Sequence, residues 1–293
     1  GTPKFMASTL NERIDRIEDT ITNKLPLLED PQLQLCLLRS TQALPKLVYS
    51  LRTCKTENIN SALMRFDRIQ KCALEEIIGA PLTSIAVAQA SLPVSKGGLG
   101  LRKATLHSRA AYLSSSVQSK AIVDKILQAL PHRRPLQEAL ASFLATAGPL
   151  TPETEADLTT LQSNHFTQSK LSHHIDSNLQ TTLLNRAIGD KDARTKARLQ
   201  SLTLNHASDY LNSVPSHFFG LSMSRENFRF ALKYRMGLPL YASTEFACPA
   251  CNKPMDPFGD HTIVCATENE RICRHDALRD AIFDQARHAG LFP

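Results

Sequence analysis

Tryptophan is absent from this sequence, and aromatic residues make up only 6% of its 293 positions. Strands are enriched in aromatic and β-branched residues, so the shortage argues against a strand-rich fold. Leucine, alanine, glutamine, lysine and arginine are plentiful, and all of them favour helices. Because 42% of the residues are hydrophobic and 21% are charged, the chain is globular rather than disordered. The composition therefore predicts an all-α fold.

Long apolar runs are also missing. No stretch is long enough to span a bilayer. The first 20 residues lack the basic start and the apolar centre of a signal peptide. We therefore expect a soluble intracellular protein, nuclear or cytoplasmic.

The motifs of several enzyme classes are absent as well. There is no GxSxG, no HExxH and no pair of carboxylates in a polymerase-like context. Adjacent histidines occur at His173 and His174, but neighbouring positions of a helix point in different directions, so we expect both to be exposed to solvent. We expect no catalytic residues in this chain.

Hydrophobic residues at helical spacing recur along most of the sequence. Asp30 is the expected N-cap of the second helix, Pro31 its first residue, and Pro45 its kink or end. The first three helices, with short connections, predict a small bundle. The expected helices cover residues 5–25, 31–51, 58–78, 103–120, 121–130, 133–147, 155–188, 190–213, 224–236 and 268–290.

Two segments interrupt this pattern. Residues 90–102 read ASLPVSKGGLGLR, and three glycines and a proline predict a tight loop with exposed backbone. Residues 147–155 read AGPLTPETE, which is typical of a linker. No Walker-type Lys-Ser/Thr follows the glycines, so we expect no nucleotide binding there.

The strongest motif is CPACNKPMDPFGDHTIVC, with the spacing C-x2-C-x9-H-x3-C. Thiolates and imidazole are the ligands that zinc prefers, and the prolines and glycine between the pairs let the chain turn back. Four protein ligands leave no open position, which predicts a structural zinc ion. Asp260 is a possible partner of the site or a helix cap. The predicted ligands are Cys248, Cys251, His261 and Cys265, with Cys273 and His275 as weaker substitutes.

The other three cysteines are scattered singly through helical sequence. In a reducing compartment the simplest interpretation is that Cys36, Cys54 and Cys72 are small buried hydrophobic residues.

The formal net charge is +6 and the pI is about 9.0, which suggests nucleic acid as a partner without proving it. Basic residues recur every four positions on residues 224–236 and form one stripe, beside Phe228, Leu232 and Met236 on a packing face. A second cluster surrounds the glycine-rich loop, where backbone amides can also meet phosphate. Each set is either a phosphate contact or an ordinary solvated surface. The candidate phosphate contacts are Lys96, Arg102, Lys103, Arg109, Arg225, Arg229 and Lys233.

Several segments resemble the C-terminal half of reverse-transcriptase-like proteins from non-LTR retrotransposons, especially those with a restriction-like endonuclease. Residues 1–10 resemble the exit from the polymerase palm. Residues 29–52 and 90–116 resemble the start and the end of the thumb. Residues 205–215 (NHASDYLNSVP) and 228–240 (FRFALKYRMGLPL) resemble the linker before the knuckle. The zinc motif and residues 271–291 resemble the knuckle and the first nuclease helix.

The resemblance implies four regions: a thumb-like bundle (1–117), a helical linker region (118–240), a zinc knuckle (241–267) and the first helix of a truncated nuclease-like domain (268–293). It implies that the thumb holds an RNA or DNA template–primer and that the knuckle region holds target DNA. The family's palm aspartates and nuclease catalytic residues fall outside this sequence, and Tyr210 stands where relatives often have tryptophan. The expectation is a nucleic-acid-binding portion of a reverse transcriptase without catalytic residues of its own. The alternative is a domesticated, zinc-stabilised scaffold for protein–protein interaction.

Overall fold

The computed structural model describes residues 3–126, 135–148, 167–241, 246–265, 267 and 270–291. Over these residues the chain consists of helices and turns, with a single isolated antiparallel bridge between Ala247 and Pro254 in place of any sheet. The all-α prediction is confirmed. Two compact units divide the chain: a helical unit, Gly1–Met236, and a knuckle unit, Gly237–Pro293.

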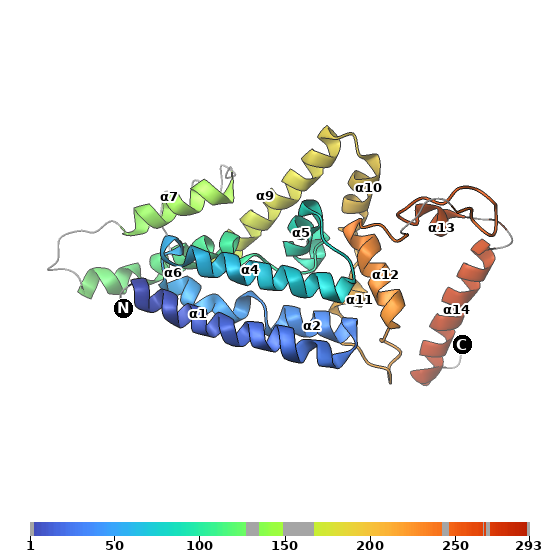
Figure 1. Cartoon of the computed structure of the whole chain (residues 1–293), viewed down its shortest axis with the longest axis horizontal. Helices are drawn as coiled ribbons and strands as arrows, with labels where there is room; N and C mark the ends of the chain where they lie inside the picture. Colours follow the sequence, from blue (N-terminus) through green and yellow to red (C-terminus); the bar gives the residue numbers. More distant parts are fainter. Residues whose placement is uncertain are drawn as a thin grey trace. The chain divides into compact units, whose positions relative to one another are not determined.

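The helical unit is built around α1 (Pro3–Asp19) and α4 (Thr56–Ile78), which run side by side (Figure 1). Both carry apolar residues at helical spacing, and these side chains form the core. On the first segment and on α4, the apolar residues at helical spacing are each at most 7% exposed. They comprise Leu10, Ile14, Ile17, Ile21 and Leu25 from the first segment and Leu63, Phe66, Ile69, Leu74, Ile77 and Ile78 from α4.

The end of the first helix differs from the expected α-helix to residue 25. After Asp19 the chain widens into a π-helical turn, Thr20–Lys24, and then tightens into a 3-10 turn, Leu25–Leu28. Thr20 donates its hydroxyl to the carbonyl of Arg16 at 2.9 Å, and hydroxyl bonds of this kind disturb a regular helix. Pro26, within the 3-10 turn, has no N–H to donate.

The predicted start of the second helix is confirmed. Asp30 caps α2 (Pro31–Thr41) by accepting from the backbone N–H groups of Gln32 and Leu33 at 2.8 and 3.2 Å. The segment around Pro45 is a 3-10 turn, Leu44–Leu47, which leads into α3 (Val48–Thr53). The proline therefore ends the helix rather than kinking it.

In the rest of this unit, α6 packs against α3, α4, α7 and α9, while α10 packs against α9 and α12 packs against α2, α4 and α5. The predicted boundary at residue 117 falls inside α6, so both predicted regions share one core. One short helix, α5, was not expected from the sequence. The bounds are α5 Ser84–Ser91, a 3-10 turn Val94–Lys96, α6 Ala104–Ile126, α7 Pro135–Ala147, α9 Gln168–Gly189, α10 Ala193–Ser201, α11 Asp209–Asn212 and α12 Arg225–Met236.

The knuckle unit contains α13 (Asp260–Val264) and α14 (Glu270–His288). Most of the predicted linker at 147–155 and the start of the segment 155–188 lie outside the described residues. Among the described helices, none combines the length and the apolar character that crossing a membrane requires.

Two expectations about single side chains are wrong. His174 is only 8% exposed, because it faces the interior from α9, and Asn178 lies 2.9 Å from its Nε2. Cys72 lies on the exposed side of α4 and Cys36 is half-buried, so only Cys54 is the buried cysteine predicted for all three. Adjacent positions on a helix face different surroundings, and a partly buried helix can therefore hide one member of the His-His pair.

Candidate metal centre and basic surfaces

Cys248 and Cys251 lie on one tight turn. The backbone N–H of Asn252 donates to the carbonyl of Cys248, and the N–H of Cys248 donates to the carbonyl of Lys253, both at 2.8 Å. Asn252 has φ 57°, in the left-handed region that asparagine tolerates better than most residues. The two-residue spacing of the cysteines therefore forms a closed loop that turns the chain back.

Asp256 organises the second half of the motif. Its carboxylate accepts from the backbone N–H groups of Phe258 at 2.9 Å, Asp260 at 3.1 Å and His261 at 2.7 Å. These bonds fix the start of α13, so Asp256 performs the capping role that the sequence suggested for Asp260. The sequence D-P-F-G-D (residues 256–260) indicates this role of Asp256, because an aspartate at the start of a turn often accepts hydrogen bonds from the backbone amides that follow it.

Gly259 explains why the chain can turn between the two ligand pairs. Its φ is 79°, and a Cβ atom placed there would lie 2.6 Å from Cδ1 of Leu240. The hydroxyl groups of Tyr241 and Thr262 are 3.0 Å apart, so the segment before the knuckle also packs along α13. These contacts hold His261 and the residue that follows α13 in place.

The four predicted ligands converge. Their ligand atoms all lie within 4.8 Å of one another. Sγ of Cys248 is 3.9 Å from Sγ of Cys265, and Sγ of Cys251 is 3.1 Å from Nε2 of His261. Zinc–ligand bonds of roughly 2.0–2.3 Å in a tetrahedron place ligand atoms at comparable separations, so this donor set fits a tetrahedral ion.

The substitute ligands lie elsewhere. Cys273 is exposed on α14, and Nδ1 of His275 is 3.2 Å from the carboxylate of Asp276. Neither belongs to the converging group among the described residues. Hydrogen bonds from the backbone and hydroxyl of Thr267, with smaller effects of the neighbouring thiols, lower the pKa of Cys265 to about 6. A thiol of this kind is readily deprotonated, as a metal ligand must be.

The basic stripe on α12 is not uniformly available to a ligand. Arg229 donates through Nε to the carbonyl of Ile77 and through Nη2 to that of Glu76, both at 3.0 Å. It therefore caps the C-terminal end of α4. Arg225 is exposed, Lys233 is half-buried, and neither side chain has a hydrogen bond or an ion pair within the described part of the chain. The packing face beside them is confirmed: Phe228, Leu232 and Met236 are at most 2% exposed.

Three members of the second basic set contact the protein itself. Lys96 donates to the hydroxyl of Ser177 at 2.7 Å. Arg102 pairs with the Asp176 carboxylate at 2.6 Å. Arg109 donates through Nε to the Ser142 hydroxyl at 3.0 Å.

The fourth member of this set, Lys103, is half-buried. Its side chain makes no hydrogen bond or ion pair among the residues that the structure describes. Lys103 therefore joins Arg225 and Lys233 as a predicted phosphate contact. The side chains of these three residues make no hydrogen bond or ion pair among the described residues.

The glycine-rich loop is buried, not exposed as expected. The backbone N–H groups of Gly97 to Leu101 all donate to carbonyls of residues 90–94, so they do not face a ligand. A Cβ atom at Gly98 would lie 2.0 Å from the carbonyl oxygen of Leu92, which explains the glycine by close packing.

Buried polar side chains hold the loop in place, and no motif in the sequence indicates them. Arg235, 2% exposed, donates through Nη2 to the carbonyls of Val94 at 3.2 Å and Gly98 at 3.0 Å. Gln89, fully buried, donates to the carbonyls of Gly97 and Arg235, both at 3.0 Å. Position 235 lies seven residues after Phe228 and therefore on the packing face of α12, but arginine is seldom fully buried, so its residue type predicts exposure.

The buried side chain of His107 makes the free energy of unfolding depend on pH. Burial, and to a lesser degree the charge of Arg102, lower the pKa of His107 to about 3. The ordinary pKa of histidine is about 6.5, so between these values the unfolded chain binds a proton that the folded chain does not. Stability supplied by neutral His107 is therefore present above pH 6.5 and is lost as the pH falls toward 3.

Denaturation of the wild type between pH 6.5 and 5 should show this loss, with a slope of up to about 1.4 kcal/mol per pH unit. Asp176, whose Oδ1 is 3.5 Å from Nε2 of His107, has a pKa raised by burial and acts in the opposite direction at lower pH. The His107→Gln variant should have a flatter slope in the same window. Equal slopes in the two proteins would contradict this role for His107.

Comparison with known proteins yields no match: no family model, no curated protein and no solved structure aligns significantly with this chain.

Proposed function

We propose that this chain is a nucleic-acid-binding portion of a retroelement reverse transcriptase, in which the helical unit contacts phosphates. The observation that carries this proposal is the uneven distribution of charged residues along the chain. Lysine and arginine outnumber aspartate and glutamate by nine in residues 1–236, whereas acidic residues outnumber basic ones by three in residues 237–293. A polyanion is attracted to the first region and not to the second.

The metal in the proposed function is zinc, with a structural role. Three cysteines and one histidine within 4.8 Å of one another match its preferred ligands and leave no position for a substrate. The acidic balance of the knuckle unit does not favour a knuckle that grips DNA by charge. The zinc then serves to fix the fold of this segment.

The salt dependence of binding tests the phosphate contacts. We expect the variant Arg225→Gln, Lys233→Gln to bind a DNA duplex or an RNA–DNA hybrid more weakly, with a slope of log affinity against log salt smaller by about two. Arg229 stays unchanged in this design because it caps α4. Fluorescence anisotropy of a labelled duplex at several salt concentrations gives the slope.

The matched control removes two charges elsewhere. Lys4 and Arg16 are exposed on α1 and belong to neither basic set. Lys4→Gln, Arg16→Gln should retain the wild-type slope. If Arg225→Gln, Lys233→Gln has the wild-type salt slope, the basic stripe on α12 is an ordinary solvated surface. If the wild type binds neither a duplex nor a hybrid, the proposed function is wrong.

A scaffold for protein partners is the second candidate, and α14 supports it. Four large apolar side chains on this helix are between 44% and 64% exposed. Exposed apolar side chains gathered on one element are typical of a contact surface. They are Ile272, Leu278, Ile282 and Phe283.

A further inference from the structure

A pocket of about 380 Å³ lies in the helical unit, where α12 meets the C-terminal end of α4 and the turn that precedes α2. Its apolar lining comes from the buried side chains of Ile21, Leu25, Ala73 and Ile77. Pockets that enclose small ligands have volumes of roughly 300–1,000 Å³. This pocket can therefore hold one small molecule or one unit of a polymer, but not a duplex.

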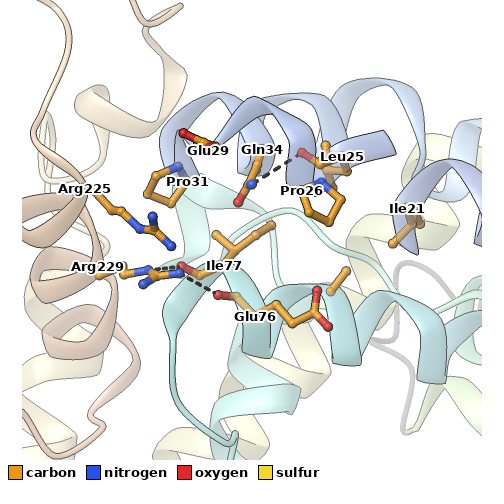
Figure 2. Close-up of a pocket in the computed structure, with 11 residues that line it drawn as sticks. Ile21, Leu25, Pro26, Glu29, Pro31, Gln34, Glu76, Ile77, Arg225 and Arg229 are labelled. Atoms are coloured by element: carbon orange, nitrogen blue, oxygen red, sulfur yellow. Dashed lines mark hydrogen bonds between the residues drawn. The ribbon is translucent and has the colours of Figure 1, made fainter. Parts of the chain in front are cut away.

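The polar groups of the pocket are separated by charge. Figure 2 shows the guanidinium groups of Arg225 and Arg229 on the α12 side and the Glu76 carboxylate on the opposite side. A further carboxylate, Glu29, also lines the pocket beside α2. The pocket thus offers an anion site at one end and acceptors for hydrogen-bond donors at the other.

The arginine end is prepared for an anion. Arg229 is fixed by its two bonds to backbone carbonyls, whereas Arg225 has no hydrogen bond or ion pair in the described part of the chain. Burial, and then the nearby charge of Arg225, lower the pKa of Arg229, so the two cations repel each other. An anion between them would relieve this repulsion.

An exposed aromatic pair lies a short distance along the chain. Phe218 and Phe219 are 88% and 62% exposed, with ring centroids 5.0 Å apart. Gln32 anchors the segment that follows them, because it donates to the Leu221 carbonyl at 3.2 Å and accepts from the Met223 N–H at 3.0 Å. Arg225 lies six positions after Phe219, so their Cα atoms are at most roughly 20 Å apart.

We propose that the pocket binds one unpaired nucleotide of a single-stranded nucleic acid, with its phosphate at Arg225 and the amino group of its base at Glu76. A neighbouring base would stack on Phe218 or Phe219, since aromatic side chains next to basic groups form single-strand sites. This proposal rests on the proposed function and specifies its ligand. Cytosine, adenine and guanine carry an amino group that can donate a hydrogen bond to a carboxylate, and thymine and uracil do not.

Single-stranded DNA decamers of deoxycytidine and of thymidine test the proposal. The wild type should bind the cytidine decamer roughly fivefold or more tightly than the thymidine decamer. Arg225→Gln should weaken binding of both roughly tenfold or more, because a hydrogen bond to a charged group is lost. Lys233→Gln, the same charge change on α12 outside the pocket, should weaken binding less. Glu76→Met should bring the two affinities close together.

A separate pair of substitutions tests whether Phe218 and Phe219 stack on a base. Phe218→Leu, Phe219→Leu should weaken binding of both single strands roughly fivefold or more and leave duplex binding unchanged. Tyr49→Leu, which removes an aromatic side chain 72% exposed on α3, is the control and should leave both unchanged. A loss of duplex binding as large as the loss of single-strand binding would overturn the stacking role.

The failures of the two proposals are distinguishable. If the wild type binds neither duplex nor single strands, the proposed function fails. If it binds them but Arg225→Gln binds the decamers as the wild type does, or if the preference for cytidine survives Glu76→Met, only the nucleotide pocket is overturned.

Discussion

Replacing Cys251 by serine is expected to release the metal from the knuckle and to unfold residues 246–265. Within this segment the only helix is the five-residue α13, and the buried side chains are few, Cys248 and Met255 among them. A segment with so small a core obtains much of its folding free energy from the bound ion. The loss of one of four ligands should therefore affect the whole segment.

Metal analysis and limited proteolysis measure this result. The wild type should keep one zinc ion per chain through dialysis, whereas Cys251→Ser should lose it and be cut within residues 246–265. Cys273→Ser is the matched control, because that cysteine is exposed on α14 and outside the cluster. Metal retained by Cys251→Ser at the wild-type level would refute the ligand assignment.

The same substitution should leave the helical unit intact. Residues 1–236 form a compact unit with a core of their own. Thermal unfolding followed by helical circular dichroism should therefore keep its main transition in Cys251→Ser. A parallel loss of that transition would mean that the two units fold as one.

The metal cluster and the long helices could be predicted from the sequence because each depends on spacing along the chain. The C-x2-C and H-x3-C pairs lie on local turns, and the apolar face of α4 follows from its helical period. The end of α1 could not be predicted in detail, because a π-helical turn involves the same residues as an α-helix and leaves no distinct pattern.

What could not be predicted depends on contacts between distant residues. Arg229 and Lys233 occupy equivalent positions in the stripe, yet one caps α4, more than 150 residues earlier in the chain, and the other does not. The glycines at 97 and 98 predict an exposed loop, and only packing against Gln89 and Arg235 makes it an interior feature. Local sequence carries no information about such partners.

The largest effect on the helical unit is expected from Arg235→Met. The side chain is 2% exposed and donates to the carbonyls of Val94 and Gly98. Methionine fills a similar volume but donates nothing, so the Gly98 carbonyl loses its side-chain donor, while the Val94 carbonyl keeps the N–H of Gly97. An unsatisfied buried carbonyl costs about 1–3 kcal/mol, and the variant should lose about that much unfolding free energy.

Thermal and urea unfolding measure the loss, and two further variants identify its cause. For a unit of this size, 1 kcal/mol shifts Tm by roughly 2–4 °C, so Tm should fall by roughly 5 °C. Arg225→Met, on the exposed side of the same helix, should change Tm little. Arg235→Lys retains a donor and should lie between the wild type and Arg235→Met. If Arg235→Met and Arg225→Met had the same Tm, the buried guanidinium would not stabilise the glycine-rich loop. The close packing at Gly98 would then be what holds the loop in place.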